Sequence, residues 1–205
     1  MFLDCRGVVE HILASVEGTA GSVMGSYKGT GVVFMRELLA TQSVEARQAF
    51  LAQLSHDELR TFRDVLPIST VSIEYVTRLF RVGGPLFYPE LGANDRLRRF
   101  GIEMARDNLQ GGYRMLLKVL SVETLIKHSP RLWRTYHGQG VAHFERLGVG
   151  HGRLTVEGYP DLPADFREAT CGFIHGAVEV AGATEIHVTC GGAPVAWFWD
   201  IAWRG

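Results

Sequence analysis

Hydrophobic side chains recur every three or four residues up to about residue 138, which is the spacing of amphipathic helices. Polar and charged residues stand between them, as on the solvent side of such helices. The pattern predicts helices over the following segments: 5–17, 32–40, 44–54, 56–65, 72–82, 95–109, 113–120, 122–128, and a last turn from Pro130 that contains Trp133 and Tyr136. This part of the chain is therefore expected to form a helical layer.

Polar residues mark where two of these helices begin. Ser43 is placed as an N-cap, and Ser55 together with Glu58 has the spacing of a capping box. Pro67 prevents the second helix from continuing, because proline has no amide hydrogen to donate.

Glycine and proline mark the breaks that follow. Gly83-Gly84-Pro85 is expected to end the helix from Ser72, and residues 85–93 to form a loop. Asn94 or Asp95 is expected to cap the next, longer helix.

The pattern changes after Gly140, where glycine and β-branched residues increase and the hydrophobic period shortens. It predicts two hairpins around one helix: strands over 141–147 and 153–157, a helix over 163–181, and strands over 184–189 and 194–203, with the turn of the second hairpin at 190–193. A run of helices followed by strands indicates an α+β fold. We expect an N-terminal helical layer packed on a C-terminal antiparallel sheet with strand–strand–helix–strand–strand order.

This organisation predicts one α+β domain over residues 1–205. Within it we expect an N-terminal helical extension over 1–24, a mainly helical part over 25–138 and a sheet part over 139–205.

Composition indicates a globular protein: 46% of the 205 residues are hydrophobic and 21% are charged. Lys and Arg number 21 against 22 for Asp and Glu, so the basic excess typical of a nucleic-acid binder is absent. No apolar run is long enough to span a membrane, and no signal peptide is evident. The three cysteines, Cys5, Cys171 and Cys190, contain no CxxC pair, so a reducing cytoplasm is expected.

Catalytic motifs are missing from the sequence. It contains no Walker spacing, no GxSxG elbow and no HExxH. Cys171 and His175 are four residues apart on one predicted helix, which leaves a catalytic Cys–His pair as an alternative. A cysteine among apolar neighbours is more often a small buried hydrophobe, so we expect a protein that is not an enzyme.

The sequence also contains candidate ligands for a metal ion or a haem. Cys171, His187 and Cys190 are weak metal candidates, with Glu185 as a fourth ligand. His187 and Cys190 are three residues apart, however, so they face opposite sides of a straight strand. His128, His137 and His143 lie near aromatic residues, but no CxxCH haem-attachment motif exists. We therefore predict no metal and no cofactor.

The C-terminus carries an aromatic row with a period of two. Trp197, Trp199, Ile201 and Trp203 fall on one face of the predicted strand. Such a row is either the core face of a sheet or the wall of an apolar cavity, and the core is the more common case. The basic cluster Arg96, Arg98 and Arg99 is interpreted as a solvated helix face.

Several motifs resemble an uncharacterised domain family known mainly from myxobacteria. They are KGTGVVF at 28–34 with the capping box at Ser55 and LPIS at 66–69, then SPRLWRTY at 129–136, CGFIHGAVEVAGA at 171–183 and a final strand ending at Trp203. The resemblance covers most of the chain from about residue 25. That family is similar to the 4-vinyl reductase domains, which share a fold with the haem–nitric-oxide-binding domain and the small TRAPP transport subunits.

The resemblance implies an often dimeric domain with a helical layer on an antiparallel sheet around an apolar ligand pocket. Sensor members of the superfamily have a zinc site whose last two cysteines are about eight residues apart. Cys190 matches the first of these, but Ala196 and Phe198 stand near the second position, so this site is expected to be lost. The Tyr-x-Ser-x-Arg motif of the haem-binding relatives does not occur in the sequence either.

We therefore predict a non-catalytic sensor or regulatory domain, located in the cytoplasm and forming a homodimer. It would bind a small hydrophobic ligand or a signalling protein partner but no nucleic acid, and it would have no membrane span. The alternatives are a dimeric scaffold or adaptor without a ligand and, third, a Cys/His or metal-dependent enzyme. The residues expected to line the pocket are Phe100, Met104, Trp133, Cys171, Ile174, Trp197 and Trp199.

Overall fold

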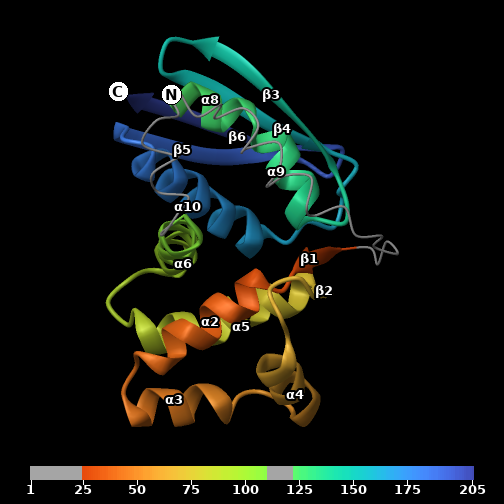
Figure 1. Ribbon diagram of the computed structural model, residues 1–205, viewed down its shortest axis with the longest axis vertical. Coiled ribbons are helices and arrows are strands. Elements are labelled where there is room, and N and C mark those ends of the chain that lie inside the picture. The colour runs from red at the N-terminus through yellow and green to blue at the C-terminus, as the bar shows by residue number, and fades with distance from the viewer. Residues whose placement is uncertain (1–24, 110–121) are drawn as a thin grey trace, which may run out of the picture.

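The computed structural model describes residues 25–109 and 122–205. The helices expected over 5–17 and 113–120 lie outside these residues. The described chain stacks in layers, with the sheet at one end and helices α3 (Val44–Leu51) and α4 (His56–Asp64) at the other (Figure 1). The predicted α+β class is confirmed, since the helices precede a C-terminal antiparallel sheet.

The sheet is built from two hairpins separated by one helix, as the sequence predicts. In chain order the elements are β3 (Val141–Gly148), β4 (His151–Glu157), α10 (Ala164–Val180), β5 (Thr184–Ala193) and β6 (Ala196–Arg204). The strands lie side by side in the order β3-β4-β6-β5, and every neighbouring pair is antiparallel. Helix α10 lies against one face of this sheet (Figure 1). Gly182 follows the helix with a φ of 98°, as expected for a glycine after a helix C-terminus.

The second hairpin turns later than predicted. Residues 190–193 belong to β5, and the chain reverses between Ala193 and Ala196. Gly192 has a φ of 109°, and a Cβ there would lie 2.2 Å from the carbonyl oxygen of Ala196. Only glycine therefore allows β5 and β6 to stay paired at this position.

The prediction that His187 and Cys190 face opposite sides of their strand is confirmed. Cys190 pairs with Trp199, on the face that packs against α10, whereas His187 pairs with Ala202 and is exposed on the opposite face. The row of aromatic residues on β6 is the core face of the sheet, because Trp197, Trp199, Ile201 and Trp203 are all buried.

The helical part contains a small antiparallel pair of strands in addition to its helices. Its remaining elements are β1 (Ser26–Lys28), α2 (Thr30–Ala40), β2 (Thr70–Ser72), α5 (Ile73–Phe87), α6 (Ala93–Asn108), α8 (Val122–Lys127) and α9 (Ser129–Tyr136). The predicted caps at Ser43 and Ser55 are confirmed, and Ser55 forms its capping box with Glu58.

Two boundaries differ from the prediction. Helix α5 continues through Gly83-Gly84-Pro85 to Phe87, so the loop expected from 85 is shorter. The helix is kept by packing, because Gly83 is buried and a Cβ there would lie 2.9 Å from the side chains of Met35 and Phe87. Helix α6 begins after Gly92 rather than after Asn94 or Asp95, since the Arg96 amide already donates to the Gly92 carbonyl at 3.0 Å.

Helices α6 and α10 touch through their backbones. A Cβ on Gly101 would lie 2.0 Å from the carbonyl oxygen of Ala169, and one on Gly172 would lie 1.9 Å from that of Arg98. Ion pairs join the same two helices, with Arg98 bound to Glu168 at 2.8 Å. This contact ties the helical layer to the sheet. None of the helices in the described ranges is long and apolar enough to cross a membrane.

Candidate functional site

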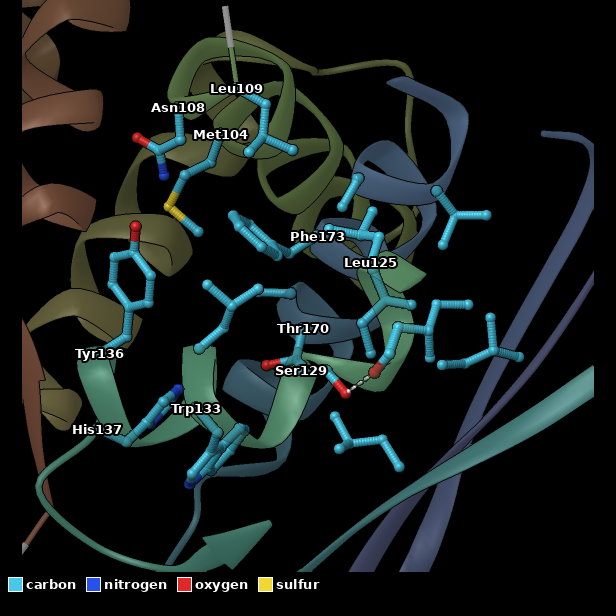
Figure 2. A pocket seen from close by; sticks show the side chains of 18 of the residues that line it. Met104, Asn108, Leu109, Leu125, Ser129, Trp133, Tyr136, His137, Thr170 and Phe173 are labelled. Carbon is cyan, nitrogen blue, oxygen red and sulfur yellow. Dashed lines mark hydrogen bonds between the residues drawn. The ribbon is translucent and has the colours of Figure 1, made fainter. Parts of the chain in front are cut away.

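An apolar pocket of about 130 Å³ lies where α6, α8, α9 and α10 meet the inner face of the sheet (Figure 2). We call it the interhelical pocket. Its lining residues are Tyr27, Met104, Asn108, Leu109, Leu125, Ile126, Ser129, Leu132, Trp133, Tyr136, His137, Leu154, Phe166, Ala169, Thr170, Phe173, Ile174, Ala177, Val178 and Ile201. None of them carries a formal charge when His137 is neutral. The volume is close to that of an engineered cavity of about 150 Å³ that binds benzene.

Three of the residues predicted to line a pocket do so: Met104, Trp133 and Ile174. Phe100 lies instead between α5 and α6, where its ring stacks on Phe80 with centroids 5.1 Å apart.

The other predicted pocket residues are also in the core. The indole nitrogens of Trp197 and Trp199 donate to the backbone carbonyls of Tyr159 and Arg167, at 2.8 and 3.1 Å. From β6 it is Ile201 that reaches the pocket. Cys171 is buried outside the pocket lining, near Cys190.

Two polar atoms of the pocket lining are buried without a hydrogen-bond partner: Nδ2 of Asn108 and Nδ1 of His137. Figure 2 shows both residues along one side of the pocket, with Tyr136 between them. A buried polar group without a partner costs about 1–3 kcal/mol, so such atoms are rare in native proteins. Both atoms belong to residues that line an otherwise apolar pocket.

The His137 ring is held by aromatic neighbours. It stacks on Trp133 with centroids 3.6 Å apart and meets the edges of Tyr27 and Phe166 at 5.0 and 5.6 Å. Burial lowers the pKa of His137 to about 3, because an imidazolium would be desolvated there. His137 is therefore neutral near pH 7. The other two haem candidates, His128 and His143, are exposed.

Sequence reasoning missed Asn108 and did not assign His137 to the pocket. Asn108 follows Met104 by four residues, so the two share one face of α6, and this spacing was a usable signal. Phe173 lines the pocket from α10, and no sequence signal distinguished it from a core residue.

Two other hollows among the described residues have a different character. One of about 300 Å³ includes Glu37, Glu103, Arg106 and Asp107, and one of about 400 Å³ includes Glu123, Lys127 and Arg146. Charged side chains that already pair with each other, such as Arg146 and Glu123 at 2.9 Å, fill much of their walls. Both linings mix charged and apolar side chains, whereas the lining of the interhelical pocket is almost entirely apolar.

Glu168, Cys171 and Cys190 form a second cluster, in which the carboxylate and thiol atoms all lie within 4.8 Å of one another. The Cys190 thiol donates to Glu168 Oε1 at 3.4 Å. The hydrogen bond between the two cysteines lowers the pKa of Cys190 and, together with burial, raises that of Cys171.

The cluster differs from both the predicted metal candidates and the predicted catalytic pair. It excludes His187, which is exposed on the other face of β5, and Glu185, which pairs with Arg204 at 2.9 Å. Cys171 has Cys190 and Glu168 as neighbours rather than His175. Three ligand atoms are one short of the four that a closed structural zinc site uses.

No family model and no curated protein sequence matches the chain. Solved structures of H-NOX proteins match its fold. An Fe(II) unliganded H-NOX protein from K. algicida has a TM-score of 0.61 and 11% identity, and the match covers 87% of this chain and 97% of that one. An H-NOX protein from S. oneidensis in the Fe(II)NO state has a TM-score of 0.62 and 11% identity, covering 87% and 99%.

An oxygen-binding H-NOX domain related to soluble guanylate cyclases matches with a TM-score of 0.55 and 11% identity, over 86% of this chain and 93% of that one. The expected similarity to haem–nitric-oxide-binding domains is thus confirmed for the fold. Similarity to the vinyl reductase domains, the TRAPP subunits and the myxobacterial family stays a prediction.

A haem group does not fit the interhelical pocket in the described conformation of its side chains. The pocket has a volume of about 130 Å³, which suits a single small ring rather than a macrocycle. The carboxylates of a haem would also meet no cationic side chain among the described lining residues.

Proposed function

We propose that this protein is a sensor domain that binds a small, neutral, largely apolar molecule directly in the interhelical pocket. The molecule carries one polar group that meets Asn108 or His137. The similarity in fold to oxygen- and nitric-oxide-binding H-NOX proteins supports a sensing role by analogy alone.

Size and charge support this ligand class. A pocket of about 130 Å³ accommodates a molecule near the size of benzene. An ionised ligand is disfavoured, because the described lining offers no opposite charge and burial of an unpaired charge costs several kcal/mol.

The observation that carries the proposal is the pair of buried, unpartnered polar atoms, Asn108 Nδ2 and His137 Nδ1, in a pocket that is otherwise apolar. Asn108 Nδ2 is a donor, so it selects an acceptor such as a hydroxyl or carbonyl oxygen. Neutral His137 accepts at one ring nitrogen and donates at the other.

The test is a matched panel of benzene, phenol and benzoate, measured by isothermal titration calorimetry and by the shift in Tm. Phenol is expected to bind most tightly, benzene more weakly and benzoate not at all. Asn108→Leu is expected to weaken phenol binding about fivefold and to leave benzene binding within about twofold, because one hydrogen bond is worth about 1 kcal/mol. Asn94→Leu, at an exposed position of the same helix, is the control and leaves both affinities unchanged.

The proposal fails if none of the three compounds binds and a crystal structure shows the pocket filled by ordered water on Asn108 and His137. It also fails if benzoate binds as tightly as phenol, because the pocket would then not select a neutral ligand.

A further inference from the structure

Cys171 and Cys190 bring two thiols from distant parts of the sequence together. Cys171 lies on α10 and Cys190 on β5, and both are free. Neither lines the interhelical pocket, so the cluster that they form with Glu168 is independent of the proposed ligand site.

The two thiols differ in access. Cys171 is 1% exposed, whereas Cys190 is half-buried and so reachable by a small reagent. Access decides which sulfur reacts first, because an oxidant must touch the attacking atom.

The surroundings of Cys190 supply a proton acceptor in a fixed position. The Cys190 thiol donates to Glu168 Oε1, and the other carboxylate oxygen of Glu168 accepts from Arg98 Nε at 2.8 Å. Arg98 also donates to the Val188 carbonyl at 3.3 Å, two residues before Cys190 on the same strand. The carboxylate is thereby held against the thiol from the helix side.

We propose that Cys171 and Cys190 are a redox-reactive dithiol, which hydroperoxides convert into a disulfide that joins α10 to β5. Cys190 is the attacking thiol, Cys171 is the resolving thiol, and Glu168 positions and accepts the proton of Cys190.

The chemistry balances with one equivalent of hydrogen peroxide. The Cys190 thiol proton passes to Glu168 as the sulfur attacks one peroxide oxygen. The O–O bond breaks, and the departing hydroxide takes the proton from Glu168 and leaves as water. Cys190 is then a sulfenic acid. The Cys171 sulfur attacks the Cys190 sulfur, the S–O bond breaks, and the Cys171 proton leaves with the hydroxyl as a second water. A dithiol reductant reverses the change.

The experiment uses the full chain, reduced and then freed of reductant, with its metal content measured by inductively coupled plasma mass spectrometry. Hydrogen peroxide is added, remaining thiols are alkylated, and the protein is mapped by non-reducing peptide mass spectrometry. The expected product is an intramolecular Cys171–Cys190 disulfide that dithiothreitol reverses. A cross-link between a helix and the sheet is also expected to raise the Tm by several degrees.

Single substitutions distinguish the roles of Cys171, Cys190 and Glu168. Cys171→Ser is expected to stop at a Cys190 sulfenic acid, which dimedone labels, whereas Cys190→Ser is expected to leave Cys171 unreacted. Cys5→Ser is the control and forms the disulfide as the wild type does. Glu168→Gln is expected to slow the oxidation of Cys190 roughly tenfold with the same final product. Circular dichroism verifies that each variant is folded.

Three results would overturn the proposal. One is a disulfide that includes Cys5 in place of the Cys171–Cys190 pair. The second is an equal rate of dimedone labelling at Cys171 and Cys190. The third is stoichiometric zinc in the purified protein that must be removed before oxidation, since the cluster would then be a metal centre and not a free dithiol.

Discussion

At the residue scale, His137 links folding to pH. Its ring is buried between aromatic side chains, and its pKa falls to about 3 from the usual value near 6.5. Between these two values the unfolded chain binds a proton that the folded chain does not. The contribution of His137 to stability is therefore fully present above pH 6.5 and is lost as the pH falls toward 3.

We expect His137→Phe to remove part of the acid sensitivity. This variant keeps an aromatic ring against Trp133 but has no proton to bind. Between pH 7 and pH 5, the wild type is expected to lose about 2 kcal/mol more of its free energy of unfolding than the variant. Urea denaturation at the two pH values measures the difference. His143→Phe, at an exposed position, is the control and should follow the wild type. Equal pH dependence of His137→Phe and the wild type would contradict a buried neutral imidazole.

At the scale of elements, the contact between α6 and α10 holds the helical layer against the sheet. Gly101 and Gly172 let the two backbones touch, and a Cβ at either position would overlap with backbone atoms of the other helix. Backbone cannot move aside as a flexible side chain can, so the whole helix has to shift. Because α6 and α10 also form two walls of the pocket, this contact sets the pocket's shape.

Gly172→Ala is accordingly expected to reduce the free energy of unfolding by about 3 kcal/mol. The added methyl group would meet the carbonyl of Arg98 at 1.9 Å, and intrinsic helix propensity, which favours alanine, is too small to compensate. Gly148→Ala is the matched control, because no atom lies within 4 Å of the added Cβ there, and it should change stability by less than about 0.5 kcal/mol. A neutral Gly172→Ala variant would show that the two helices are further apart than described.

At the scale of the whole molecule, a fold similar to that of H-NOX proteins is combined here with a small apolar pocket. The match covers 87% of the chain, yet the pocket has the volume of a single small ring and no cationic side chain in its described lining. A shared fold therefore does not imply a shared cofactor. The expected homodimer and cytoplasmic location remain predictions.

We expect the protein not to incorporate haem. After incubation with hemin and gel filtration, it should carry far less than one haem per chain by its Soret absorbance. The H-NOX protein from S. oneidensis, treated in parallel, is the positive control. Stoichiometric haem with a defined axial ligand would refute the direct-ligand proposal and would mean that the pocket opens far beyond its present volume.

Much of the fold could be predicted from interactions between residues that are close in the sequence. The capping box at Ser55 and the alternating aromatic residues of β6 depend on neighbours within a few positions, and both are observed. The predicted end of α5 was wrong, because Gly83-Gly84-Pro85 is a break by local rules, but Gly83 packs against Met35 and Phe87 in the folded protein. Local propensity is a weak preference that tertiary packing overrides.

The sequence by itself determined the α+β class, the order of the strands and the helix in the C-terminal sheet part, and which face of β6 is apolar, since each follows from periodicity and capping. Only the tertiary structure decided which core residues leave a pocket among them, that Asn108 and His137 face it, and that Glu168 lies with Cys171 and Cys190. These groupings join residues far apart in the chain, and their distances depend on how whole helices cross, which no local pattern encodes.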